Sequence, residues 1–200
     1  MNAKKIAVSI LLLSVTVAMP ARADWGIGPL VGMNLANPDV EDHEIKTVTG
    51  WAFGARIESG MLPFLSLMLD PMLVKTGAEF DATATEPSGE GEFTSLEIPV
   101  LLKAKLQLLN VGVYGFLGPD IFFNTDASGR VSSSDASSMG LAGQVGAGAL
   151  LAVAPLIHLT LDARYSHGFT DLLDGAKGDV KHWRTRDVRL TLGLLFHSPL

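Results

Sequence analysis

The sequence predicts an all-β fold: an eight-stranded, antiparallel, up-and-down transmembrane β-barrel that is preceded by a cleaved signal peptide. Two observations carry this prediction. Eight segments alternate between apolar and polar residues with a period of two, which is the pattern of strands that face two different environments. The connections between these segments are alternately short and long, as in outer membrane barrels with turns at one end and loops at the other.

The composition excludes several classes of protein. Only 18% of the 200 residues are charged, where about 25% is usual in a soluble domain, and 48% are hydrophobic. The formal net charge of -6 is the opposite of the basic face that a nucleic-acid-binding protein needs, so we expect no nucleic-acid partner. The chain has no cysteine, which excludes disulfide bonds and thiolate metal sites.

The first 23 residues carry the marks of a secretory signal peptide. Lys4 and Lys5 precede an apolar stretch over residues 6–19, and Ala21-Arg22-Ala23 has the form of a cleavage site. This stretch of 14 residues is shorter than the ~20 that a transmembrane helix needs. We therefore expect residues 1–23 to be removed and residues 24–200 to form one barrel domain.

The expected strands are residues 25–36, 48–60, 65–79, 93–107, 111–124, 139–153, 156–170 and 185–196. In the second strand, Trp51 and Phe53 lie on the face opposite to Arg56 and Glu58. The third and fifth strands are less regular, because Pro71 and Pro119 lie inside them. Proline cannot donate to a β-ladder, so we expect a bulge or a bend at both positions.

The remaining strands separate their faces more clearly. Their apolar faces carry Leu96, Ile98, Val100, Leu102, Ala104 and Leu106 in the fourth strand, Ile157, Leu159, Leu161, Ala163, Tyr165 and Phe169 in the seventh, and Val188, Leu190, Leu192, Leu194 and Phe196 in the eighth. The opposite faces are polar, with Glu97 and Lys103 in the fourth strand and Asp162 and Arg164 in the seventh. Period-two alternation of this length is typical of β-strands.

The sixth strand has a competing interpretation. Residues 136–157 contain no charge over 22 positions, which is long enough for a transmembrane helix. Larger residues such as Leu141 and Val145 nevertheless keep odd positions, and small or polar residues such as Gly140, Gln144 and Gly146 keep even ones. This alternation favours a strand, and a helix remains the alternative.

Three connections are short, over residues 61–64, 108–110 and 154–155, and four are long, over 37–47, 80–92, 125–138 and 171–184. In a membrane barrel the apolar face of each strand meets lipid and the polar face meets the lumen. We therefore expect the lumen to hold a set of charges that pair with one another as a structural plug: Arg56, Glu58, Glu97, Lys103, Asp162, Arg164, Asp187 and Arg189. The alternatives are an ion path along these charges and a soluble, lipocalin-like barrel with the two faces exchanged.

Three runs resemble the PorT-like family of outer membrane β-barrels. These runs are Leu96-Glu97-Ile98-Pro99-Val100-Leu101-Leu102-Lys103, the segment from Leu161 to Asp171 with Arg164-Tyr165 and Gly168, and the closing segment from Asp187 to Phe196. The resemblance implies an eight-stranded outer membrane barrel and no particular chemistry. One departure is that four residues follow Phe196, where such barrels often end on the aromatic residue.

The long connections carry much of the acidity. Residues 37–47 hold four acidic residues and Lys46, and residues 80–92 hold four more acidic residues. Neither has the regular spacing of a calcium loop, so we expect solvated loops and no metal site. In residues 171–184, Lys177, Lys181 and Arg184 could contact lipopolysaccharide phosphates. We expect the membrane-interface aromatics to be Trp25, Trp51, Tyr165 and Trp183.

No residue pattern identifies an enzyme. Ser166 and His167 are adjacent on a strand and point to opposite faces, and His158, Asp162 and Ser166 are spaced by ~13 Å per step along one face. We expect no catalytic, cofactor or metal residue. The predicted function is a non-enzymatic, monomeric outer membrane barrel with a structural or surface-interaction role, whose partners are membrane lipids, lipopolysaccharide and the barrel assembly machinery. The alternatives are a passage for small solutes or apolar ligands, a lipid-acting enzyme and a periplasmic binder.

Overall fold

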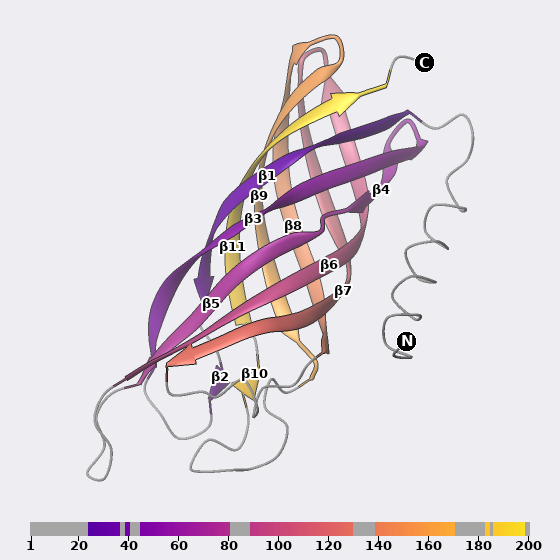
Figure 1. Cartoon of the computed structure of the whole chain (residues 1–200). Helices are drawn as coiled ribbons and strands as arrows, with labels where there is room; N and C mark the ends of the chain where they lie inside the picture. Colours follow the sequence, from indigo (N-terminus) through magenta and orange to yellow (C-terminus); the bar gives the residue numbers. More distant parts are fainter. Residues whose placement is uncertain are drawn as a thin grey trace, which may run out of the picture.

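The computed structural model describes residues 24–36, 39–40, 45–80, 89–129, 139–170, 183–184 and 186–198, with side chains for 24–35, 49–76, 94–125, 139–170 and 186–198. Nine strands form one antiparallel sheet (Figure 1): β1 (Trp25–Ala36), β3 (Ile45–Leu62), β4 (Leu65–Leu69), β5 (Met72–Phe80), β6 (Gly89–Leu108), β7 (Val111–Gly129), β8 (Gly140–Ala154), β9 (Ile157–Gly168) and β11 (Arg186–His197). The signal peptide predicted for residues 1–23 lies outside the described residues.

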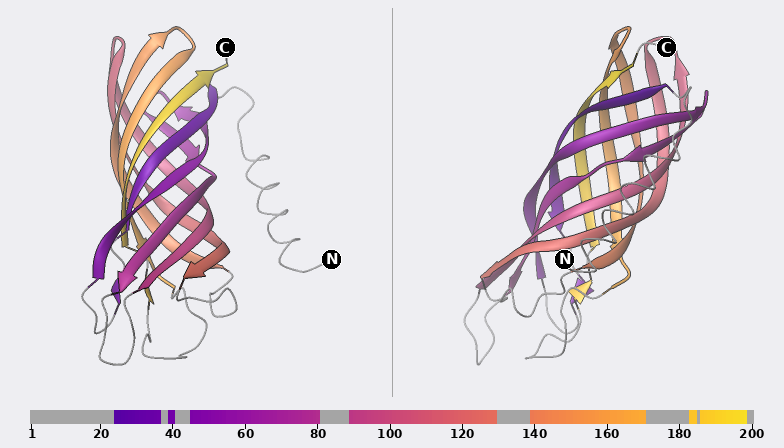
Figure 2. Two further views of the ribbon diagram at one scale, coloured as in Figure 1. Left: turned by 60° about the vertical axis from the view of Figure 1, so that its left-hand side comes forward. Right: turned by 45° about the vertical axis from the view of Figure 1, so that its right-hand side comes forward.

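The sheet closes on itself. Apart from β4 and β5, which do not pair with each other, each strand of the sheet pairs with the next along the chain. β1 pairs with both β3 and β11, which joins the first strand to the last. Because β4 and β5 both lie between β3 and β6, they form one interrupted strand, and the barrel has the eight strands that the sequence predicted. Figure 2 shows these strands tilted around a closed wall. A closed barrel leaves no strand edge, so the backbone polar groups are paired within the wall.

The interruption between β4 and β5 falls at Asp70-Pro71, which confirms the bend predicted at this proline. The wall remains continuous there, because Ala55 N donates to Pro71 O at 3.0 Å and Asp70 N donates to Pro99 O at 3.3 Å. At Pro119 the bulge that was one of the two predicted outcomes is absent, since β7 runs through this residue without a break. The β6–β7 register is the same on both sides of Pro119, so no residue is inserted and no bulge forms.

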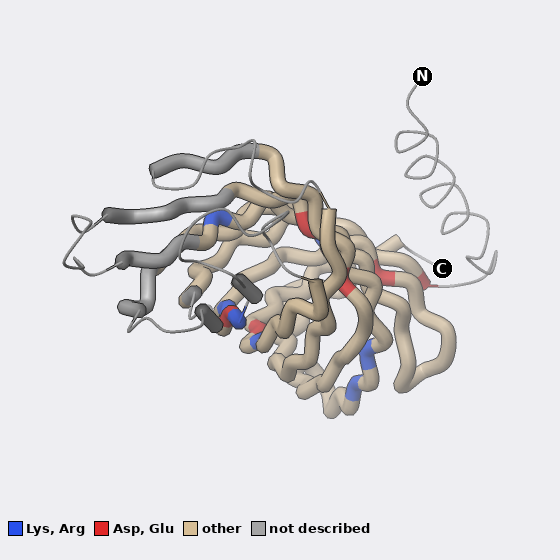
Figure 3. Tube along the Cα trace, turned by 90° about the horizontal axis from the view of Figure 1, so that it is seen from below, with Lys and Arg blue, Asp and Glu red and all other residues tan. Residues whose placement is uncertain are grey.

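The two faces of the wall are inverted relative to a soluble protein. Leu161 and Leu117 are 57% and 63% exposed on the outer face, whereas Thr160 and Asp162, the polar neighbours of Leu161 along β9, point inward and are buried. The apolar belt ends toward the loops at the outward-facing Thr49, Thr125 and Arg186. Charged residues are few along the described strands when the barrel is viewed from the loop end (Figure 3). This arrangement excludes the soluble alternative, which required the apolar face to point inward.

Segment 140–154, for which a helix was the alternative, is the strand β8. Among the described residues, no helix is long and apolar enough to cross a membrane.

The start of β1, the end of β11 and the three short turns lie at the same end of the barrel, which we name the turn end (Figure 1). The other end, the loop end, is where β2 (Asp39–Val40) and β10 (Trp183–Arg184) pair as a separate two-stranded sheet that was not predicted. Several strands extend further toward the loop end than expected. The β6–β7 ladder reaches Gly91↔Gly129 and contains one register shift, between Thr94 and Ser95.

Glycines of β8 make room for aromatic rings of β7 inside the barrel. Tyr114 faces Gly148, Phe116 faces Gly146, and Phe122 faces Gly140 across the two strands. A Cβ atom at Gly148 would lie 2.5 Å from Tyr114 Cζ, so the ring occupies the space that a side chain would need. Tyr114 and Phe116 are buried with Met68, Leu101 and Leu150 in an apolar cluster of the lumen. These pairs explain why one face of β8 is rich in glycine.

Candidate functional site

The lumen contains the polar groups that can serve a function. All eight charges that the sequence assigned to it are buried, none more than 5% exposed: Arg56, Glu58, Glu97, Lys103, Asp162, Arg164, Asp187 and Arg189. They come from β3, β6, β9 and β11, and they point inward because each occupies the polar phase of a period-two strand. They form three clusters along the barrel axis.

The turn-end cluster consists of Glu58, Ser66, Lys103 and Tyr114. Lys103 Nζ lies 2.7 Å from Glu58 Oε2, and the Ser66 hydroxyl donates to Glu58 Oε1 at 2.8 Å. The same ammonium lies 4.0 Å from the centre of the Tyr114 ring, a cation–π contact. Both charges therefore have a partner in a part of the lumen that is closed to solvent.

The central cluster contains two arginines and two aspartates. Arg56 donates to Asp70 through Nε at 3.0 Å and through Nη2 at 2.8 Å, a bidentate pair. Arg164 Nη2 donates to Asp70 Oδ2 at 3.0 Å and to Asp162 Oδ2 at 2.9 Å, and Arg56 also pairs with Asp162. The Tyr114 hydroxyl donates to Asp162 Oδ1. Two positive and two negative charges thus cross-link strands on several sides of the barrel.

The loop-end cluster is built around Arg189. Its Nη1 and Nη2 donate to Glu97 at 2.8 and 3.0 Å, and its Nε donates to Asn34 Oδ1 at 3.1 Å. The Gln144 amide donates to Glu97 at 3.3 Å and to Asp120 Oδ2 at 2.9 Å. Asn34 Nδ2 donates in turn to Asp187 Oδ2 at 3.3 Å.

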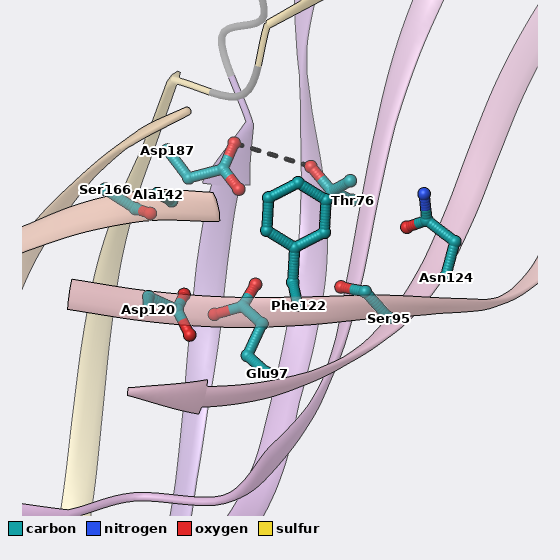
Figure 4. A pocket seen from close by; sticks show the side chains of 9 residues that line it. All are labelled: Thr76, Ser95, Glu97, Asp120, Phe122, Asn124, Ala142, Ser166 and Asp187. Atoms are coloured by element: carbon teal, nitrogen blue, oxygen red, sulfur yellow. Dashed lines mark hydrogen bonds between the residues drawn. The ribbon is translucent and has the colours of Figure 1, made fainter. Parts of the chain in front are cut away.

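A small cavity lies within the loop-end cluster (Figure 4). Its volume is about 10 Å³, and it is lined by Thr76, Ser95, Glu97, Asp120, Phe122, Asn124, Ala142, Ser166 and Asp187. The Thr76 hydroxyl donates to Asp187 Oδ1 at 3.4 Å across one side of it. A volume of this size holds roughly one water molecule. At this level the described part of the lumen therefore has room for little more than one water molecule.

Sequence reasoning missed several members of these clusters. Asp70 and Asp120 each adjoin a proline in the strands whose alternation was least regular, so the sequence did not show which face of the strand each side chain occupies. Asn34 lies in the first strand, whose faces were not separated, and Tyr114 has an aromatic side chain that the sequence does not mark as inward. The aspartates could have been found by continuing the alternation of faces through each proline, because Asp70 and Asp120 each lie one position from a proline.

The residues considered for catalysis do not form a nucleophile and base pair. Ser166 is buried in the lumen, whereas His167 lies on the outer face against Tyr165 and Phe169, with ring centres 6.4 and 5.8 Å away. His158 contacts the ring of His197 at the turn end, with 4.4 Å between ring centres, and His197 Nδ1 lies 3.3 Å from Asp24 Oδ1. The first contact joins β9 to β11, and the second joins the residue before β1 to β11.

Among the described residues, no group of three or more His, Asp or Glu is placed to hold a metal ion. The side chains of the acidic loops and of Lys177, Lys181, Arg184 and Trp183 lie outside the described residues. Three of the four aromatic residues expected at the membrane interface, Trp25, Trp51 and Tyr165, are about half exposed on the outer wall.

Comparisons with known proteins agree with this architecture. The family model described as outer membrane protein beta-barrel domain matches residues 8–196. The solved structure of the outer membrane protein OprG from Pseudomonas aeruginosa is similar, with a TM-score of 0.61 at 12% identity over 89% of this chain and 97% of that chain. Neisserial surface protein A is similar with a TM-score of 0.50 at 18% identity, over 86% and 96%. No curated protein sequence matches the chain.

Proposed function

The chain belongs to the outer membrane protein β-barrel domain family and resides in the outer membrane, and from this premise we propose that it is a closed, non-conducting barrel with a structural or surface-interaction role. The barrel is the rigid part, and its four long connections are the part that contacts other molecules. This role requires no catalytic residue and no cofactor.

The observation that carries this proposal is the filled lumen. The central cluster places Arg56, Asp70, Asp162 and Arg164 across the barrel, and none of these side chains is more than 2% exposed. The turn-end and loop-end clusters block the lumen on either side. Buried charges that are fully paired resist displacement, since separating one pair leaves an uncompensated charge in a medium of low dielectric constant. We therefore expect solutes and ions to be excluded.

Conductance in a planar lipid bilayer tests this proposal. We expect the refolded wild-type barrel to give no stepwise current, because the three clusters fill the lumen. The double variant Asp162→Ser/Arg164→Ser removes one opposite pair from the central cluster and should raise the current. Retention of the folded band in unheated SDS gels controls for unfolding of this variant. Stepwise wild-type currents would contradict the proposal and would favour the alternative of a passage channel.

A lipopolysaccharide contact is the surface role that the sequence supports. The fourth connection carries Lys177, Lys181 and Arg184, and such side chains bind phosphate groups. We expect Lys177→Gln/Lys181→Gln to reduce the lipopolysaccharide that copurifies with the barrel. The matched control is Asp174→Asn/Asp179→Asn, which removes two charges of the opposite sign from the same connection. Equal amounts of copurified lipid in all three proteins would contradict a specific contact.

A further inference from the structure

The three lumen clusters differ in their charge balance. The turn-end cluster pairs one lysine with one glutamate, and the central cluster pairs two arginines with two aspartates. The loop-end cluster has one arginine, Arg189, against three buried carboxylates, Glu97, Asp120 and Asp187. Two negative charges therefore have no buried positive partner among the described residues. Buried carboxylates of this kind are neutralised either by a cation or by a proton.

Asp120 is one of these three carboxylates, and one of its two oxygens lacks a hydrogen-bond partner among the described residues. The residue is 1% exposed, and its Oδ2 accepts a hydrogen bond from Gln144 at 2.9 Å. Its Oδ1 is buried and has no hydrogen-bond partner among the described residues. Asp120 lines the loop-end cavity together with Glu97 and Asp187 (Figure 4). An orphaned carboxylate oxygen beside a cavity points to a ligand that neither the hydrogen bonds nor the ion pairs supply.

We propose that the loop-end cavity binds one small, hard cation, with Asp120 Oδ1 as a direct ligand and Ca²⁺ as the ion of best fit. The functional groups around the cavity are carboxylates, hydroxyls and an amide, from Asp120, Glu97, Asp187, Thr76, Ser95, Ser166 and Asn124. Oxygen ligands of this kind select hard cations, and two excess negative charges match a divalent one.

The size of the cavity favours calcium over magnesium. Mg²⁺ usually keeps several of its water molecules, whereas Ca²⁺ accepts six to eight oxygen ligands in flexible geometry. A cavity of about 10 Å³ has room for one atom and not for a hydrated ion. Since no three acidic side chains among the described residues are placed to close on a metal ion, the cation would be held by one or two carboxylates together with the hydroxyl and amide oxygens around the cavity. The proposal goes beyond the passive role proposed above and does not depend on it.

Isothermal titration of CaCl₂ into the refolded barrel in zwitterionic detergent at neutral pH tests this proposal. We expect one saturable site in the wild type and affinity weakened by about tenfold or more in Asp120→Asn, because the substitution removes a charged ligand. The matched control is Asp24→Asn, which removes a carboxylate from the turn end and should leave the titration unchanged. MgCl₂ should bind more weakly than CaCl₂.

Two outcomes would overturn the proposal. If Asp120→Asn binds calcium as the wild type does, the ion is held elsewhere. If the wild type shows no saturable heat and Asp120→Asn is more heat-stable in calcium-free buffer, protons neutralise the cluster instead. Asp187→Asn is the second variant in case Asp120→Asn does not fold, and it should also weaken calcium binding because Asp187 lines the same cavity.

Discussion

At the scale of single residues, Lys103 and Glu58 illustrate how the barrel interior is stabilised. Their charged atoms lie 2.7 Å apart, and both side chains are almost fully buried. Removing one partner of such a pair costs about 3–5 kcal/mol, whereas replacing both with apolar residues of similar volume is often neutral or stabilising. The pair therefore matters for stability mainly because removing one partner would leave the other charge buried and unpaired.

This reasoning predicts the result of a double-mutant cycle. Lys103→Met should lower the free energy of unfolding by about 3–5 kcal/mol, because Glu58 is left buried without a counter-charge. Lys103→Met/Glu58→Met should recover most of this loss. The measurement is the urea midpoint of unfolding from lipid vesicles. A double variant that is less stable than Lys103→Met would show that the pair itself supplies the stability.

The contact between Gly148 and Tyr114 gives a second prediction at this scale. Gly148→Ala should destabilise the barrel by about 1–3 kcal/mol, since its Cβ would lie 2.5 Å from Tyr114 Cζ and 2.6 Å from Leu161 O. Gly115→Ala is the matched control, because a Cβ there meets its nearest atom at an ordinary 3.7 Å. The same unfolding midpoints measure both variants. Equal stability of the two would contradict the packing that we describe around Tyr114.

The sequence predicted eight of the charged residues that enter the lumen and did not predict their partners. Period-two parity alone assigned all eight charges correctly, because a strand allows a side chain only two directions. The pairs join residues far apart in sequence, such as Arg56 and Asp162, and they depend on how far each strand is shifted against the next. That shift is a property of the closed barrel and cannot be read from the sequence of any single strand.

At the scale of strands, the two prolines show why local rules predicted only part of the wall. Pro71 interrupts its strand, whereas Pro119 lies within the continuous β7. Both lack an amide donor, but the register of β6 and β7 is the same on both sides of Pro119. The missing donor therefore interrupts the pairing of β7 with β6 next to Pro119, and the strand is not displaced. Sequence could mark both positions as irregular and could not distinguish the two outcomes.

The outward face of β11 allows a test of membrane depth. Leu192 is the middle of five apolar outward positions, and Leu108 lies beside a turn at the turn end, where it is 83% exposed. Leu192→Arg should destabilise the barrel by about 2–4 kcal/mol, since arginine at the bilayer midplane is costly, and Leu108→Arg by about 0–1 kcal/mol. Unfolding from vesicles of one lipid composition measures both. A larger loss for Leu108→Arg would place the membrane elsewhere along the barrel.

At the scale of the whole molecule, one pattern governs both fold and location. The wall is apolar outside and its interior is charged, and the closed sheet leaves no unpaired edge. These properties make the protein stable in lipid and unsuited to water. They follow from strand alternation and from the order of short and long connections, which is why the architecture could be predicted without a homologue.

The most direct test of this account is the gel mobility of the protein from an outer membrane fraction, unheated and boiled in SDS. A closed membrane barrel resists SDS until it is heated, because its hydrogen-bonded wall has no open edge. The account predicts a heat-dependent shift in mobility and a protein that stays with the outer membrane. Identical mobility in both samples, with the protein released among periplasmic proteins by osmotic shock, would contradict it.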